Sequence, residues 1–158
     1  MKAIVAVDTS WGIGREGELL YHISADLKRF KALTLGHPVI LGRKTLSTFP
    51  GGKPLPGRRN LVLSRDQDFH PEGVEVFRDL PSLLEAAPQD SFVIGGESVY
   101  RQFLPYCKEV YVTHIRKTGG ADAFFPDLTA DPAWVPAEVG EDQEEKGISF
   151  RFVTYRRK

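Results

Sequence analysis

Three segments of the chain place glycine, hydroxyl or basic residues directly after a predicted buried strand. They are Gly42, Arg43, Lys44 and Thr45 after the strand at 38–41, Ser64 and Arg65 at the end of the strand at 60–64, and Gly95 and Gly96 after the strand at 91–94. Because the carboxyl ends of neighbouring parallel strands meet at one edge of an open sheet, we expect these segments to form one anion-binding edge. Glycine lets a backbone approach a phosphate, and a helix that begins after Gly96 presents free N–H groups. A dinucleotide with an additional ribose phosphate would use all three segments.

Asp26 is the second candidate for chemistry. It lies in the first turn of a predicted helix at 24–35, and spacings of four and seven residues put it on the same face as Phe30 and Leu33. Its carboxylate is therefore expected to point toward apolar surroundings. One interpretation is an acid that complements the positive end of the helix dipole, and the other is a buried acid that receives hydrogen bonds from a ligand. The residues alone leave both interpretations open.

Other kinds of site lack support. The glycines at 12, 14 and 17 match a dinucleotide-binding spacing, but residues 18–23 show no helical periodicity, so we interpret the glycines as a mobile loop over a cleft. The four histidines have no metal-ligand spacing, and no Ser, His and Asp combination indicates a nucleophile. We predict no metal site, and we assign the single cysteine, Cys107, to packing.

These residues depend on short hydrophobic runs that alternate with helix-period segments, a pattern typical of an α/β sheet. Predicted strands lie at 2–7, 38–41, 60–64, 74–77, 91–94, 109–115 and 148–156. Predicted helices lie at 24–35, 43–48, 80–87 and 97–104, with Ser24 and Asp79 as N-caps. The last strand alternates apolar residues on two faces, which suits an antiparallel edge strand. We predict one α/β domain over residues 1–158, with a mostly parallel central sheet, an antiparallel C-terminal strand and helices on both faces.

Composition restricts the class of protein. The chain has 158 residues, of which 21 are basic, 21 are acidic and 41% are hydrophobic. This is typical of one globular domain, and a net charge of zero argues against binding nucleic acid through bulk charge. The N-terminal apolar run ends at Asp8, which makes it too short for a membrane span or a secretion signal. We expect a cytoplasmic protein without a membrane or nucleic-acid partner.

Charge is uneven along the chain. Residues 43–65 carry six basic residues and no acid, and their place beside strand ends makes a ligand-binding role as plausible as a solvated surface. Five acidic residues crowd positions 138–145. We interpret this acidic run as solvated surface.

Seven blocks of sequence occur in the order and spacing of one family. They are Gly12–Gly14, Ser24–Leu27 with Phe30, Val39–Thr45, Leu55–Asn60, Val93–Gly96, Tyr111–Ile115 and Asp122–Pro126. On these blocks the chain resembles the dihydrofolate reductases over essentially its whole length. The resemblance implies an eight-stranded sheet flanked by helices and NADPH as the hydride donor. It also implies reduction of 7,8-dihydrofolate to tetrahydrofolate, with hydride transfer to pterin C6 and protonation of N5 through water.

The resemblance further implies a substrate site. Asp26 matches the carboxylate that binds the pterin donors, Thr113 matches the hydroxyl that supports this acid, and Arg58 matches the arginine that binds the glutamate tail. Tyr21 stands where the family usually has an indole that orders a water, so we group it with Asp26 and Thr113 as catalytic. The other implied substrate-binding residues are Ile4, Val5, Ala6, Leu27, Phe30, Phe49, Leu55, Ile94 and Tyr100. Antifolate inhibitors are expected to bind at the same place, in a monomer.

The cofactor site implied by the resemblance coincides with the predicted anion-binding edge. Its residues are Ala6, Ile13, Gly14, Gly17 and Leu19 near the nicotinamide; Gly42, Arg43, Lys44, Thr45, Leu63, Ser64 and Arg65 near the adenosine and its phosphate; and Ile94, Gly95, Gly96, Glu97, Ser98, Val99 and Tyr100 near the pyrophosphate. In the family the paired glycines are joined by a cis peptide bond, which is rare outside proline.

The chain departs from the common family pattern close to Asp26. Leu20 and Tyr21 stand where Pro-Trp is usual, and Ser24 replaces a frequent proline. Two alternative functions are a riboflavin-pathway pyrimidine reductase of the same fold and a nucleotide-binding relative without catalysis. Asp26 and Arg58 suit a pterin and a glutamate tail better than a ribitol phosphate, and a non-catalytic relative would not need Asp26.

Overall fold

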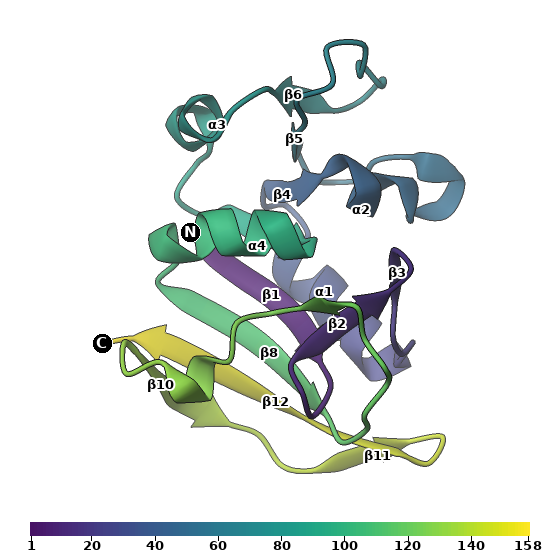
Figure 1. Ribbon diagram of the computed structural model, residues 1–158, viewed down its shortest axis with the longest axis vertical. Helices are drawn as coiled ribbons and strands as arrows, with labels where there is room; N and C mark the ends of the chain where they lie inside the picture. The colour runs from purple at the N-terminus through teal and green to yellow at the C-terminus, as the bar shows by residue number, and fades with distance from the viewer.

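The molecule is built on one central sheet (Figure 1). The computed structural model describes all residues from 1 to 158. The strands of the sheet are β1 (Lys2–Val7), β4 (Val39–Gly42), β5 (Asn60–Leu63), β6 (Glu75–Phe77), β7 (Phe92–Gly95), β8 (Glu109–Ile115), β10 (Trp134–Val139), β11 (Gln143–Glu145) and β12 (Ile148–Arg157). They lie in the order β10-β12-β8-β1-β7-β4-β5-β6, and β11 pairs with β12. The five pairs from β8 to β6 are parallel, whereas β12 is antiparallel to all its partners. The predicted fold class is confirmed, with nine strands instead of the expected eight.

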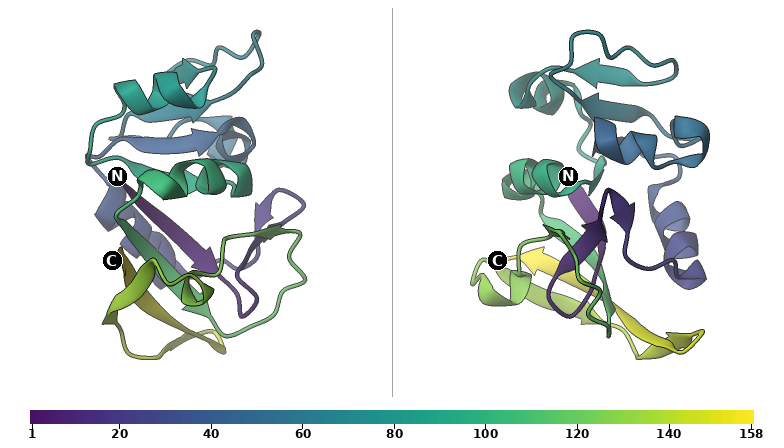
Figure 2. Two further views of the ribbon diagram at one scale, coloured as in Figure 1. Left: turned by 60° about the vertical axis from the view of Figure 1, so that its left-hand side comes forward. Right: turned by 45° about the vertical axis from the view of Figure 1, so that its right-hand side comes forward.

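Helices cover both faces of the sheet, as predicted (Figure 2). On one face lie α1 (Ser24–Thr34) and α2 (Arg43–Ser47), and on the other lie α3 (Leu80–Ala86) and α4 (Glu97–Phe103). The short 3-10 helices are η1 (Pro50–Gly52), η2 (Leu104–Tyr106) and η3 (Leu128–Ala130). A membrane-crossing helix would have to be longer and more apolar than any helix here.

The central strands are buried on both faces, which explains their nearly continuous apolar sequences. Alternate residues of β1 point to opposite sides of the sheet. Ile4 packs in a cluster with Leu46 of α2, whereas Val5 packs in a larger cluster with Leu83 of α3 and Phe103 of α4. Each such side chain stabilises the fold by about 1.5–3 kcal/mol when it is fully buried. This packing fixes the strand ends on which the candidate site depends.

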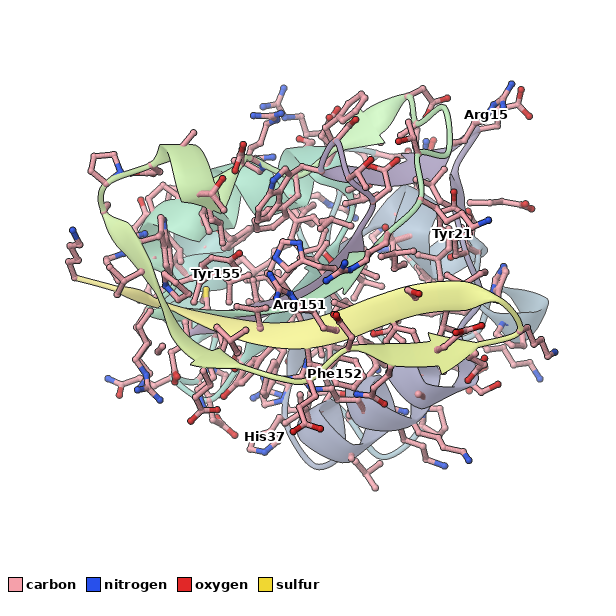
Figure 3. The ribbon with its side chains drawn as sticks, turned by 90° about the horizontal axis from the view of Figure 1, so that it is seen from below. Arg15, Tyr21, His37, Arg151, Phe152 and Tyr155 are labelled. Atoms are coloured by element: carbon pink, nitrogen blue, oxygen red, sulfur yellow. The ribbon has the colours of Figure 1, made fainter.

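The sequence predicted that the C-terminal strand forms an edge of the sheet, and this prediction is wrong. β12 lies between β8 and β10, and β10 forms the edge with Pro136 within it. Only Trp134 of β10 is buried, so this strand lacks the alternation that would have identified it. The two faces predicted for β12 are confirmed: Phe152 lies on the side of α1, whereas Tyr155 lies on the opposite side (Figure 3).

The segment of Gly12, Gly14 and Gly17, interpreted from the sequence as a mobile loop, contains paired strands. It forms β2 (Gly12–Arg15) and β3 (Glu18–Leu19), and β2 also pairs with β9 (Ala123–Phe124) in a separate three-stranded sheet. The buried carboxylate of Asp8 organises this region, because it accepts hydrogen bonds from the backbone N–H groups of Ser10, Gly12 and Gly119. Strands of two to four residues give too little periodicity to predict.

Helix α1 begins with a cap that the sequence did not predict. The N-cap position is Ile23 and not Ser24, and no side chain near the helix start supplies a cap. Instead, the carboxylate of Glu145 on β11 accepts hydrogen bonds from Ser24 N at 2.7 Å and Ala25 N at 3.2 Å. The interpretation of the acidic residues at 138–145 as solvated surface is therefore wrong for Glu145, whose carboxylate caps α1. These backbone hydrogen bonds lower the pKa of the Glu145 carboxyl.

We predict that Glu145→Ala lowers the melting temperature by roughly 2–4 °C at pH 7, because two N–H groups of α1 lose their acceptor. The pKa of Glu145 is lowered in the folded chain, so its stabilising effect is complete above the ordinary value of 4.5 and is lost as the pH falls through the lowered value. Scanning calorimetry should therefore show the difference from wild type closing at acid pH. Glu144→Ala is the matched control at an exposed neighbouring position. An equal loss in both variants, or a loss independent of pH, would contradict the capping role.

Candidate active site

The three predicted strand exits meet at one edge of the sheet. In the parallel pairing, Gly42 of β4 lies opposite Leu63 of β5, and Leu41 of β4 lies opposite Gly95 of β7. The residues that follow these strands are therefore neighbours. This arrangement confirms the predicted juxtaposition of the three segments, and it follows directly from parallel pairing.

The paired glycines leave open space beside Thr45. The peptide bond between Gly95 and Gly96 is cis, as the resemblance implied. A Cβ atom at Gly95 would lie 3.5 Å from Thr45 Oγ1, and one at Gly96 would lie 3.4 Å from the same atom. Side chains at these two positions would fill the approach to this backbone. Their absence fits a group that must come close to the main chain, such as a pyrophosphate.

Basic side chains surround this edge, but one of them already has an anionic partner. Lys44 and Arg65 are exposed, whereas Arg43 Nη1 lies 2.9 Å from Asp66 Oδ2. Ser64 is buried, and its hydroxyl accepts a hydrogen bond from the backbone N–H of Asp66. The basic stretch is thus partly neutralised by an acid that directly follows it in the sequence, which the sequence analysis missed.

The start of α4 lies next to the paired glycines. Ser98 is exposed, whereas Val99 is buried in the core. The carboxylate of Glu97 accepts a hydrogen bond from Phe124 N at 2.6 Å, so this side chain ties α4 to β9. The hydroxyl of Tyr100 donates to the carbonyl oxygen of Ile4 at 2.6 Å, and burial raises the pKa of this phenol. Tyr100 therefore connects α4 to β1.

Asp26 is placed against β8 by a single side-chain hydrogen bond. The hydroxyl of Thr113 donates to Asp26 Oδ1 at 2.5 Å, across 87 positions of sequence. Burial raises the pKa of the Asp26 carboxyl, while the Thr113 hydrogen bond and the positive charge of Arg29 oppose the rise. The half-buried position and the contact with Thr113 support the second interpretation of Asp26, a ligand-binding acid, over a simple helix-dipole partner.

Most of the predicted apolar substrate residues lie together. Phe30, Phe49, Leu55 and Ile94 are partly buried and pack against the cluster that contains Ile4. Four predicted residues lie apart from this cluster. Leu27 is 48% exposed. Val5 and Tyr100 pack in the core on the opposite face of the sheet, and Ala6 packs against a third cluster together with Tyr21.

Arg58 is held at the far end of α1. Its Nε atom donates to the Pro56 carbonyl oxygen at 2.9 Å, and its Nη1 atom donates to Thr34 Oγ1 at 3.0 Å. Asp26 and Thr34 are eight residues apart on one helix, which corresponds to about 12 Å along the axis. The carboxylate of Asp26 thus lies in the first turn of α1, and the guanidinium of Arg58 is bonded to the last residue of this helix.

A small apolar cavity joins the predicted nicotinamide residues to Tyr21. It is lined by Ala6, Val7, Asp8, Gly12, Ile13, Leu19, Leu20, Tyr21 and Ile115. Ala6 lies opposite Thr113 in the β1–β8 pairing, so the cavity adjoins the residue that supports Asp26. Gly14 lies in β2, and Gly17 lies in the turn between β2 and β3. The structure therefore brings the predicted nicotinamide residues Ala6, Ile13 and Leu19 together with Tyr21.

The chain is similar to known proteins along nearly its whole length. Residues 1–157 match the family described as dihydrofolate reductase. A dihydrofolate reductase of Mycobacterium leprae is 49% identical, covering 98% of this chain and 96% of that protein. A dihydrofolate reductase of Bacillus subtilis is 34% identical, covering 98% and 93%.

A solved structure has the same fold. Dihydrofolate reductase from Enterococcus faecalis, complexed with NADP(H) and RAB-propyl, superposes with a TM-score of 0.87 at 33% identity, covering 99% of this chain and 95% of that one. The cis glycine pair and the Asp26–Thr113 contact are the features that the sequence resemblance implied. On this sequence and structural similarity, the chain belongs to the dihydrofolate reductase family.

Proposed function

We propose that this chain reduces 7,8-dihydrofolate to 5,6,7,8-tetrahydrofolate with NADPH, and that Asp26 binds the pterin. The observation that carries the proposal is the carboxylate of Asp26, which is half-buried beside β8 and bonded to Thr113. Withdrawing an acid from water is costly unless it is paired, and only one hydrogen bond from a side chain supports Asp26 here. A pterin offers the missing partners, since its N3–H and 2-amino groups form a planar pair of donors that matches a carboxylate.

The surroundings of Asp26 suit the remainder of this substrate. Phe30, Phe49 and Leu55 provide apolar walls for flat rings. The carbonyl groups of Ile4 and Ile94 can accept from the additional amino group of an antifolate bound in the same place. Arg58 contacts Thr34, which lies about 12 Å from Asp26 along α1, and its guanidinium can bind the carboxylate of a glutamate tail there. The two polar ends of the substrate would thus lie beside the two ends of α1.

NADPH supplies the hydride for pterin C6 when it is bound at the edge formed by the three strand exits. Gly95 and Gly96 give close access to the backbone for a pyrophosphate. Arg43, Lys44 and Arg65 provide positive charge for the ribose phosphate, with the Ser64 hydroxyl as a further donor. Ala6, which lies opposite Thr113 on β8, would contact the nicotinamide and so bring it close to the pterin.

Asp26 acts through charge and position in this mechanism. Its ionised form holds the pterin ring in place and favours a proton on N5, which arrives through water and not from a side chain. Thr113 keeps the carboxylate oriented, and Tyr21 borders the cavity at which this water would enter. Every residue named belongs to one chain, so we expect the monomer to be active. Separately, we expect the reaction to take place in the cytoplasm.

The direct test is a decrease of absorbance at 340 nm with NADPH and dihydrofolate. We expect turnover with dihydrofolate and none with a pyrimidine ribitol phosphate in a parallel assay. Turnover of the pyrimidine alone would instead identify the related riboflavin-pathway activity.

We predict that Asp26→Asn, which keeps the shape but removes the charge, slows hydride transfer at pH 7 by roughly two orders of magnitude or more. The rate should recover at acid pH, because the substrate then arrives already protonated. Single-turnover absorbance measurements across pH test this, and thermal melting checks that the variant is folded. A variant with the wild-type rate and pH profile would return Asp26 to the role of a helix-dipole partner.

We predict that Arg65→Ala weakens NADPH binding by about one to two orders of magnitude, because a charge-assisted contact to the 2′-phosphate is lost. NADH binding should stay nearly unchanged, since NADH lacks this phosphate. Isothermal titration calorimetry with both cofactors makes the comparison, and equal losses would remove Arg65 from the phosphate site.

A further inference from the structure

An acidic side chain lies within the positively charged edge that we assign to the ribose phosphate. Asp66 Oδ2 lies 2.9 Å from Arg43 Nη1, and the two side chains are 41% and 49% exposed. Asp66 directly follows Ser64 and Arg65, two further residues of this phosphate site. The carboxylate of Asp66 is therefore paired with Arg43, a cation that a bound ribose phosphate would also use.

The backbone around Asp66 is held firmly in this place. Its N–H donates to Ser64 Oγ at 3.2 Å, and its second carboxylate oxygen accepts from Asp68 N at 3.0 Å. The guanidinium of Arg78 donates to the carbonyl oxygens of Asp66, Ser64 and Phe69. The loop thus has a fixed shape, and Asp66 remains at the phosphate site even when its side chain turns away from Arg43.

Two effects of this carboxylate oppose a phosphate. It neutralises part of the charge of Arg43, and it repels a second anion placed nearby. A 2′-phosphate carries close to two negative charges at neutral pH, whereas the free 2′-hydroxyl of NADH carries none. The unfavourable interaction therefore acts on NADPH and leaves NADH almost untouched.

We propose that Asp66 is a specificity-determining residue that reduces the preference of this chain for NADPH over NADH. The proposal rests on the proposed function, because it needs the ribose phosphate to bind beside Arg43. The opposite possibility is that Asp66 orients Arg43 for the phosphate, and this predicts a change of the opposite sign.

The test is Asp66→Asn, with NADPH and NADH binding measured by isothermal titration calorimetry. Asparagine keeps the shape and an oxygen that can accept from Asp68 N. The dissociation constant of NADPH should fall about three- to tenfold at low salt, and that of NADH should change less than twofold. In 0.5 M salt the gain for NADPH should shrink, because exposed charges are screened.

Asp68→Asn is the matched control, since Asp68 is an exposed acid two residues further along the same loop. Both dissociation constants should stay within twofold of wild type in this variant. Weaker NADPH binding in Asp66→Asn would show that Asp66 orients Arg43, and unchanged binding would show that its charge is irrelevant; either result overturns the proposal.

Failure of the underlying site assignment has a different signature. If Arg65→Ala selectively weakens NADPH while Asp66→Asn has no effect, the phosphate site stands and only the role of Asp66 falls. If neither variant alters the binding of either cofactor, the phosphate lies elsewhere and both assignments fall.

Discussion

Asp26 is a carboxylate on the inner side of α1, where burial disfavours its charged form, and the Thr113 hydroxyl is the side-chain donor that compensates it. This hydrogen bond forms only if α1 and β8 are held in the correct position relative to each other. β8 is fixed by pairing along its length with β1 and β12, and the start of α1 is fixed by Glu145 on β11. The site around Asp26 therefore depends on segments that are more than eighty residues apart.

The rest of the site follows from the parallel half of the sheet. Its strand ends gather glycine and basic residues at one edge, while Asp26 and the apolar cluster around Ile4 lie on the α1 side. In the proposed function, the cations at the edge would bind phosphates, and the Asp26 carboxylate would bind the donors of a pterin. Asp66 is the exception, because it introduces negative charge into the cationic region.

The sequence predicted those features that have a local pattern. Apolar runs identified the central strands, the rule for parallel strand ends placed the three segments together, and helical spacing put Asp26 on an inward face. The partner of Asp26 came only from the family resemblance, because no spacing connects residue 26 with Thr113. β10 was missed because its side chains are mostly exposed, and the cap of α1 by Glu145 was missed because it joins residues 120 positions apart.

The claim that a half-buried Asp26 is held by Thr113 is tested most directly by titrating this carboxyl. Carbon-13 NMR of aspartate-labelled protein, assigned with Asp26→Asn, measures its pKa in the ligand-free chain. We predict a pKa above the ordinary value of 3.8, because burial outweighs the opposing contacts. Thr113→Val should raise the pKa further, because the charged form loses its hydrogen bond. A pKa at or below 3.8, or one that does not respond to Thr113→Val, would contradict the account.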